Sequence, residues 1–403
     1  MGAGLGTHSC VCSDCHSEPA QTIIVAEVLG EIPSKESRIS EVSVSSDCLV
    51  STCALEDNLS RFSDMGSDAV VDMALEEVSG LMEMDEYRVV EAEKVLAEAI
   101  ATLEARCNAF AEDADIRTEV VKSCLERLTS SSLFQTVQHR VAELDAATNI
   151  LYKHGMSVLL EDEVSKFEVF VSPDGSWFDY RMTIDIDAPL SQALATGREV
   201  DLLPKAQPLV SRAEIIGEHS NFNLKWLMRL ATPVIKTELI LETIRHRDQK
   251  FGYVLEVTRS EFSEEGISVP EKARGAIRPW VYTTSLWVPR GNGQHGCMIV
   301  QATRVDLTRS LPMWLINLVL TKLSATFIAD LRSSALKALG SDSPWAQRIQ
   351  KDEHGFYEAM RRIEKAAQHR QGVCSKNLPD RSIFQRSWRL RPPPLDTRPP
   401  SSR

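Results

Sequence analysis

The spacing of apolar residues follows a helical period from about residue 69 to about residue 155. Apolar residues recur there at intervals of three, four and seven, which places them on one face of each helix. Gly155 closes the last of these segments, and glycine commonly follows the end of a helix. We therefore expect helices over about residues 69–110, 116–128 and 134–155.

The period then changes to an alternation of apolar and polar residues, which is typical of half-buried strands. Residues 166–190 alternate on both sides of Pro173-Asp174-Gly175, a hairpin turn signal. After a short helical stretch over residues 189–206, further alternating segments are joined by short polar turns. Because such connections are too short for parallel crossovers, we expect an antiparallel sheet. These further segments cover residues 211–230, 235–247, 251–262, 273–289 and 296–307.

The last strongly apolar segment begins after Pro312, and proline is favoured in the first turn of a helix. The segment runs to Gly340 as one long helix of about seven turns at 3.6 residues each. A shorter amphipathic helix is expected across residues 345–371. One face of the long helix carries an apolar stripe that consists of Ile316, Leu320, Leu323, Phe327 and Leu331.

Length and composition are those of an ordinary soluble protein, with 403 residues of which 43% are hydrophobic and 25% charged. The most apolar run, Leu311–Leu320, is too short to span a bilayer, which takes about 20 residues. The N-terminus lacks the basic and apolar regions of a secretory signal. The nine cysteines are scattered, which argues against a disulfide framework. We expect a cytoplasmic protein without a membrane span.

Charge is distributed unevenly along the chain. The first hundred residues carry a strong acidic excess, whereas residues 372–403 hold seven Lys or Arg and two Asp. The middle of the chain lacks the clustered basic face that nucleic-acid binding needs, so we expect no nucleic-acid partner. The changes in pattern predict a disordered acidic Ser/Cys-rich head, a helical region, a sheet domain, an amphipathic helix and a disordered basic Pro/Arg tail. Their boundaries are 1–70, 71–129, 130–340, 341–371 and 372–403.

Several motifs suggest chemistry but lack its context. GNGQHG (291–296) matches G-x-G-x-x-G, yet a strand follows it instead of the helix N-terminus that a phosphate site requires, so a hairpin loop is expected. His219 and His246 are candidates for catalysis, although solvated or core histidines are the commoner case. Asp185 and Asp187 share one face of a strand and are a candidate cation site, with a solvated face the usual interpretation. We expect no enzyme activity, no cofactor and no metal ion.

The N-terminal sequence CSDCH, residues 12–16, matches the attachment motif of c-type haem. A haem site needs export and a haem-packing fold, and neither is indicated. Zinc binding by Cys10, Cys12, Cys15 and His16 is chemically reasonable. However, four ligands within seven residues leave little backbone for a tetrahedral cage.

Lipidation is the third interpretation of this terminus. Gly2 follows the initiator methionine, as N-myristoylation requires, although Gly6 stands where the motif usually has Ser or Thr. Myristate alone binds membranes weakly, and palmitoylation of Cys10, Cys12 or Cys15 would stabilise the anchor. An inert terminus is the remaining alternative.

Three segments resemble the START (steroidogenic acute regulatory-related lipid transfer) domain. Residues 178–195 look like the family's early strand leading into its first short helix. Residues 277–289 resemble its penultimate strand, and residues 304–336 resemble its final strand and C-terminal helix. The likeness covers residues 130–340. It departs from the family at Thr237-Glu238, where an Arg-Asp pair often follows a proline.

The resemblance implies an α+β helix-grip fold, in which a curved antiparallel sheet wraps around the long C-terminal helix, here with an added N-terminal helical region. Such a fold encloses an apolar tunnel for one lipid or sterol. Trp314 is expected near the tunnel mouth, and Arg274 is a candidate contact for a ligand headgroup, with a structural salt bridge as its alternative. The residues expected to face the ligand are Ile316, Leu320, Leu323 and Phe327.

The implied function is non-enzymatic binding of a lipid or sterol, used for transfer between membranes or for sensing, with peripheral contact to a membrane surface. One alternative is a lipid-gated scaffold that binds other proteins through its head and tail. Another is a cyclase or hydrolase of the same superfamily, for which no convincing acid–base pair is present.

Overall fold

The computed structural model describes residues 62–83, 88–109, 116–231, 236–248, 252–260, 270–291, 295–307, 313–338 and 340–368. These residues belong to one compact unit that spans Leu55–Arg403. The candidate lipidation sites Gly2, Cys10, Cys12 and Cys15 lie outside the described residues. None of the helices that the structure describes could cross a membrane.

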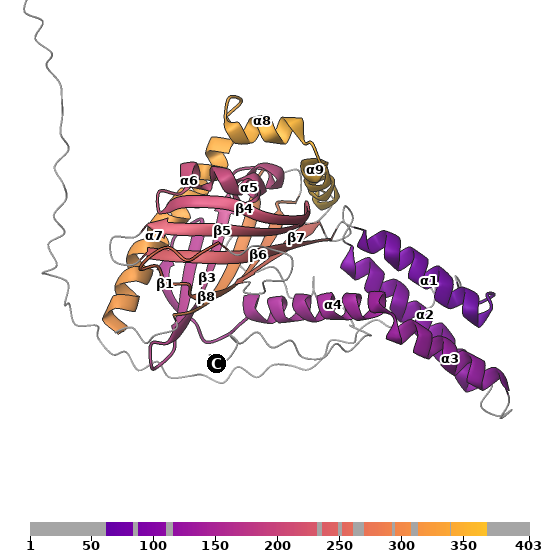
Figure 1. The fold of residues 1–403 in the computed structure, drawn as a ribbon. Coiled ribbons are helices and arrows are strands. Elements are labelled where there is room, and N and C mark those ends of the chain that lie inside the picture. Colours follow the sequence, from indigo (N-terminus) through magenta and orange to yellow (C-terminus); the bar gives the residue numbers. More distant parts are fainter. Residues whose placement is uncertain are drawn as a thin grey trace, which may run out of the picture. The chain divides into compact units, whose positions relative to one another are not determined.

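The strands of the described residues form one nine-stranded antiparallel sheet in the order β1-β2-β3-β9-β8-β7-β6-β5-β4. The sheet is seen in Figure 1. The hairpin at Pro173-Asp174-Gly175 is confirmed, since Gly175 adopts a φ of 68° and β2 pairs with β3. The edge strand β1 was not anticipated from the sequence. The strands are β1 (Ser157–Glu161), β2 (Ser165–Val171), β3 (Trp177–Ile186), β4 (Val210–Ser220), β5 (Asn223–Ala231), β6 (Lys236–Asp248), β7 (Tyr253–Ser260), β8 (Trp280–Pro289) and β9 (Cys297–Asp306).

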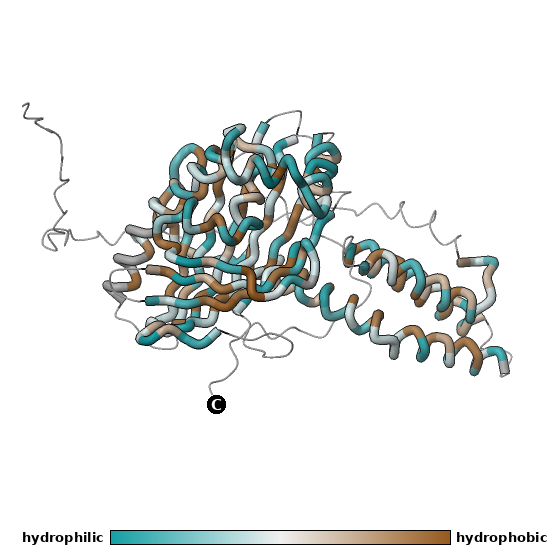
Figure 2. The backbone as a smooth tube through the Cα atoms, turned by 45° about the horizontal axis from the view of Figure 1, so that its top comes forward, coloured by the Kyte–Doolittle hydropathy of each residue, from teal (hydrophilic) through white to brown (hydrophobic). Residues whose placement is uncertain are grey.

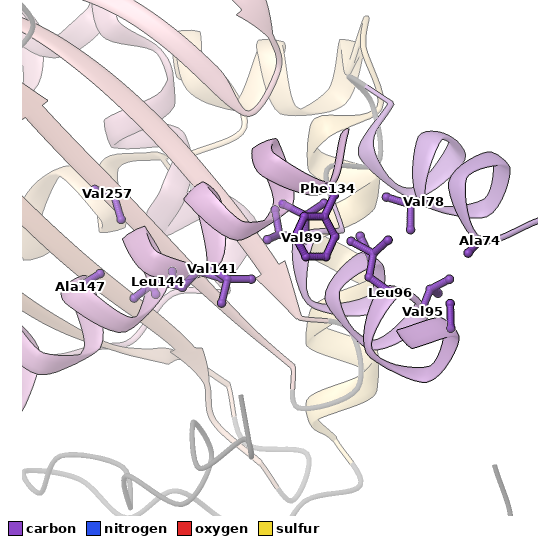
Figure 3. Close-up of a cluster of buried hydrophobic side chains, with 14 of the residues drawn as sticks. Ala74, Val78, Val89, Val95, Leu96, Phe134, Val141, Leu144, Ala147 and Val257 are labelled. Atoms are coloured by element: carbon purple, nitrogen blue, oxygen red, sulfur yellow. The ribbon is translucent and has the colours of Figure 1, made fainter. Parts of the chain in front are cut away.

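The N-terminal helices of the described residues are α1 (Ser67–Met82), α2 (Val89–Ala109), α3 (Ile116–Ser130) and α4 (Ser132–Leu151). Helix α4 packs on the outer face of the sheet, and the three other N-terminal helices pack against one another and against α4 (Figure 1). Helix α4 begins where the Ser131 hydroxyl accepts a hydrogen bond from the amide of Phe134. Its residues Val141, Leu144 and Ala147 lie in one cluster with Val257 of β7 (Figure 3). The helical region and the sheet therefore share a hydrophobic core.

The inner face packs against the C-terminal half of the chain. Helix α5 (Leu190–Arg198) and the long helix α7 (Met313–Ala338) contact each other, and α7 also contacts β1 and β3. Met182, Ile184 and Ile299 of the sheet share a core cluster with α7. Apolar stretches are visible on both the strands and the helices in Figure 2. The expected fold class, an antiparallel sheet with one long C-terminal helix and a helical N-terminal region, is confirmed.

The segment after α7 differs from the prediction of a single helix. It forms two helices, α8 (Pro344–Lys351) and α9 (Phe356–Ala367), which are separated by a tight turn. Asp352 and Gly355 have left-handed backbone, and the Asp352 carboxylate accepts hydrogen bonds from the Tyr357 and Glu358 amides. This capping starts a new helix. Both helices contribute to the same core as α7, so they are not a separate domain.

A buried carboxylate joins α4 to the sheet. Glu143 Oε2 accepts a hydrogen bond from Arg140 at 3.0 Å, and Oε1 accepts one from Arg259 of β7 at 3.1 Å. His246 Nε2 of β6 lies 3.6 Å from Oε2. Burial alone would raise the pKa of Glu143, but the His246 contact and the two guanidinium groups outweigh it and lower that pKa to about 2. The carboxylate is therefore ionised in the folded protein.

We expect Glu143→Ala to lower the free energy of unfolding by about 1–3 kcal/mol, because Arg140 and His246 lose this buried partner while Arg259 keeps its bonds to Glu242. Denaturant unfolding measures this loss. Glu126→Ala on the exposed face of α3 is the matched control and should cost less than about 0.5 kcal/mol. Equal losses for the two variants would contradict the role of Glu143.

The same network predicts a pH dependence of stability. Burial lowers the pKa of His246, so on acidification the unfolded chain takes up this proton before the folded protein does. Stability should therefore fall as the pH drops below about 6.5, by up to about 1.4 kcal/mol per pH unit. His246→Gln should flatten the slope between pH 7 and 5, with a remainder from His139, whose pKa burial also lowers. Identical slopes for the variant and the unmodified protein would show that folding does not change the pKa of His246, which would contradict this prediction.

Candidate ligand-binding site

The inner face of the sheet carries two rows of polar side chains between two apolar rows. Strand pairing places Val281 beside Val305 in one apolar row, and Val254, Trp287 and Ile299 in the other. Between them the pairings align two polar rows across the inner strands. The first row contains Thr243, Thr258, Thr283, Thr303 and Tyr180, and the second contains Arg245, Glu256, Ser285 and Gln301.

We call the first set the hydroxyl row, and its members form two short hydrogen-bonded chains. In one chain, Trp226 Nε1 donates to Thr243 Oγ1 at 2.9 Å, and Thr243 bonds to Thr258 at 2.9 Å. In the other, Thr283 and Thr303 are joined at 3.0 Å. Thr258 and Thr283 are directly paired across β7 and β8, so the two chains face each other there.

Gln301 extends the second chain, because its Nε2 donates to Thr303 Oγ1 and to the Tyr180 hydroxyl, each at 3.4 Å. Burial raises the pKa of Tyr180, so its hydroxyl stays protonated at neutral pH. Tyr180, Thr283 and Gln301 nevertheless keep accessible surface, although they lie in the middle of interior strands on the face that α7 covers. Side chains in such positions are normally packed on all sides. Their residual accessibility shows that this part of the hydroxyl row is not fully covered by neighbouring side chains.

The second row begins with a buried ion pair. Arg245 Nε lies 2.6 Å from Glu256 Oε2, and Arg245 is only 2% exposed. Burial lowers the pKa of Arg245, which the adjacent Glu256 opposes. Arg245 Nη1 and Trp287 Nε1 are buried and have no hydrogen-bond partner within the described part of the chain. Buried donors of this kind are costly unless a ligand or water bonds to them.

Helix α7 places the expected stripe as follows. Ile316 and Leu320 are buried in the core cluster that includes Met182 and Ile184, and Phe327 packs against it. The Leu323 side chain lies outside the described residues. Trp314, expected at the mouth of the tunnel, is 66% exposed at the first turn of α7. Ile328, one residue beyond Phe327, is also buried, and the sequence pattern did not single it out.

Arg274 does not lie in a strand, and its contact with a ligand headgroup stays a prediction. It lies in an exposed turn before β8, six residues ahead of the strand start, because Gly275 at φ 79° turns the chain there. Its neighbour Arg278 instead donates to the buried Glu238 at 3.1 Å, together with Arg229 of β5 at 2.6 Å. Glu238, where the sequence departs from the family pattern, is therefore the centre of an ion-pair cluster on the outer side of β6.

The remaining candidate motifs have structural roles. His246 is a core histidine beside Glu143, and the side chain of His219 lies outside the described residues. Arg290 pairs with both Asp185 and Asp187. Strands β8 and β9 pair with each other up to Pro289 and Cys297, and residues 292–294 of the GNGQHG motif lie outside the described residues. In the described ranges, no group of histidine, cysteine and acidic side chains could hold a metal ion.

A cavity of about 430 Å³ lies at the turn between α8 and α9, and Arg198, Glu218, Asn221 and Phe356 are among the residues that line it. The charged side chains that line it form ion pairs and hydrogen bonds mostly with one another. Arg198 donates to Glu218 at 2.8 Å, while Glu199 accepts hydrogen bonds from Arg348 and Tyr357. The guanidinium groups of Arg198 and Arg245 both lie within 6 Å of the Phe356 ring centroid. This turn therefore closes one end of the inner face with a paired, rigid cluster.

Comparison with protein-family models finds no match, and none is found among curated proteins. Solved structures with a similar fold include a STAR-related lipid transfer protein from Xanthomonas axonopodis, with 16% identity, a TM-score of 0.39 and coverage of 45% of this chain and 99% of that chain. Human STARD10 has 14% identity and a TM-score of 0.44, and the match covers 55% of this chain and 86% of that chain. Human StAR-related lipid transfer protein 5 has 15% identity and a TM-score of 0.43, and the match covers 51% of this chain and 99% of that chain. At these scores no residue role is transferred, and the description of the fold as an antiparallel sheet with one long helix on its inner face rests on the strand order and on α7.

We expect Glu256→Gln to lower the free energy of unfolding by about 3–5 kcal/mol, because it leaves Arg245 charged and uncompensated in the interior. Replacing both partners with apolar residues, as in Arg245→Met with Glu256→Leu, should restore most of this loss. Thermal and denaturant unfolding of the single and double variants measure it. A double variant as unstable as Glu256→Gln would contradict the assignment of a mutually dependent pair.

Proposed function

We propose that the protein binds one lipid or sterol between the inner face of its sheet and α7. The observation that carries this proposal is the accessible polar band of Tyr180, Thr283 and Gln301 between apolar rows, opposite the apolar side of α7. The hydrocarbon part would contact the apolar rows together with Ile316, Leu320 and Phe327. The polar part would meet the hydroxyl row and the Arg245–Glu256 pair.

The energetics support exchange with membranes. Each CH₂ removed from water contributes about 0.8 kcal/mol, so a chain of about 16 carbons gains roughly 12 kcal/mol in an apolar site. A bilayer offers a similar gain, so the two environments are nearly balanced. Binding can then be reversible, and the protein's contribution is a route that keeps the lipid out of water.

The outer side of α7 supports membrane contact. Between Met313 and Ala329 the sequence contains a single charged residue, Lys322. Trp314, Thr321 and Ala325 are exposed on this part of the helix. Tryptophan beside uncharged side chains favours the boundary between lipid headgroups and acyl chains. We therefore place the ligand entrance at the N-terminal end of α7, with the protein at the membrane surface only during loading and release.

Transfer between membranes and lipid sensing use the same binding step, and a lipid-gated scaffold adds protein partners to it. In the scaffold alternative, the acidic head and basic tail would recruit those partners. A cyclase or hydrolase would need a titratable pair free to act on the ligand, whereas the Glu256 carboxylate is held by Arg245. Lipid carriage by a non-enzymatic, cytoplasmic protein is therefore the proposal that this site supports best.

We expect Leu320→Arg to abolish uptake of a fluorescent fatty-acyl lipid from vesicles, because a guanidinium group would replace apolar surface that is 5% exposed. Leu336→Arg on the same helix is the matched control, since Leu336 is 46% exposed and should tolerate the charge. Uptake by Leu320→Arg equal to that of the control would contradict the proposal.

If Leu320→Arg unfolds, Thr283→Phe tests the same space from the sheet side. The larger side chain should fill the accessible surface beside Thr283 and reduce uptake at least tenfold, with little change in thermal stability. A folded Thr283→Phe variant with unchanged uptake would place the lipid elsewhere.

A further inference from the structure

The hydroxyl row is interrupted at one position. Thr258 and Thr283 are direct cross-strand partners, so their Cβ atoms lie about 4.5–5.5 Å apart, yet the hydrogen bonds of the row end at each of them. The chain that ends at Thr258 starts from the Trp226 indole, and the chain that ends at Thr283 is extended by the Gln301 amide. Both interior chains therefore converge on the same gap.

The Trp226 and Gln301 donors at the far ends fix the direction in which hydrogen bonds are donated along each chain. An indole N–H and an amide NH₂ can only donate, whereas a threonine hydroxyl donates one hydrogen and accepts others. If Thr243 donates its hydroxyl hydrogen to Thr258, and Thr303 donates its own to Thr283, the last hydroxyl of each chain still has a hydrogen that it can donate. Thr258 and Thr283 then present two O–H donors to one point between β7 and β8.

No charge lies in this row. The nearest ionic groups, Arg245 and Glu256, stand one step further along the strands and pair with each other. A phosphate at the gap would be buried among hydroxyl groups without a free cation in the row, which is unfavourable. A neutral oxygen needs no counter-ion and could accept both hydrogen bonds at about 2.7–2.8 Å.

We propose that the gap between Thr258 and Thr283 is a recognition site for a neutral oxygen, so that the protein selects uncharged lipids with a hydroxyl or carbonyl group over phospholipids. This inference rests on the proposed lipid-binding function and specifies its ligand class. The ligand oxygen joins the two hydroxyl chains into one, and its hydrocarbon part extends along the apolar rows towards α7.

The test uses the full-length protein and four defined probes: cholesterol, 5-cholestene without the hydroxyl, dioleoylglycerol and dioleoylphosphatidylcholine. Each is offered in vesicles or as a soluble complex, and its dissociation constant is measured. We expect cholesterol or dioleoylglycerol to bind at least tenfold more tightly than both 5-cholestene and dioleoylphosphatidylcholine. Tighter binding of cholesterol would identify the ligand oxygen as a sterol hydroxyl, and tighter binding of dioleoylglycerol would identify it as an oxygen of a diacylglycerol.

Threonine-to-valine variants localise the effect, because valine keeps the shape and removes the hydroxyl. Thr258→Val and Thr283→Val should each weaken binding of the preferred neutral lipid by about five- to tenfold, the equivalent of one hydrogen bond. Neither should change the affinity for 5-cholestene. The control is Thr284→Val, the adjacent residue of β8, whose buried hydroxyl lies on the opposite face of the sheet.

The outcomes separate this inference from the proposed function. Tightest binding of dioleoylphosphatidylcholine, or equal binding of cholesterol and 5-cholestene with no effect of either threonine variant, would overturn the neutral-oxygen site while leaving lipid binding intact. Failure of all four probes to bind a folded protein would overturn both. If Thr284→Val weakens binding of the neutral lipid as much as Thr258→Val and Thr283→Val do, the loss of affinity comes from a less stable sheet and not from the gap, and the inference is wrong.

Discussion

Polar groups inside a protein cost free energy unless each of them finds a partner. The inner face of this sheet contains hydroxyl, amide and ionic side chains in two complete rows, between rows of apolar residues. Most of them satisfy one another, as the bonds of Thr243 with Thr258 and of Thr283 with Thr303 illustrate. Most of this band is buried, while Tyr180, Thr283 and Gln301 are half-buried, and under the proposed function they are the part that a ligand contacts.

Two sets of helices make this arrangement workable. The outer face is closed by α4, which is tied to the sheet through Glu143 and Arg259. The inner face is covered by α7, while α5, α8 and α9 close one end of it. The outer contacts include the buried ion pairs of Glu143, whereas the first part of α7, from Met313 to Ala329, contains a single charged residue, Lys322. Under the proposed function, α7 is therefore the element expected to move when a ligand enters.

Much of the architecture could be predicted from periodicity, but the site could not. The helix after Pro312 and the turn at Pro173-Asp174-Gly175 follow directly from local spacing and turn chemistry. By contrast, Thr258 and Thr283 are ordinary strand residues, and only the register of β7 and β8 brings them together. Register depends on long-range pairing, which a single sequence does not reveal. The same limit explains Arg274, whose segment resembled a strand but turns at Gly275 before β8 begins.

Native mass spectrometry of the full chain tests the central claim most directly. The protein would be incubated with vesicles of mixed sterol, diacylglycerol and phospholipid, separated from them, and measured under conditions that preserve non-covalent complexes. We predict a complex with one lipid per chain, whose mass is that of a neutral lipid and which is absent for Leu320→Arg but present for Leu336→Arg. A folded protein that carries no lipid after this treatment would contradict the account.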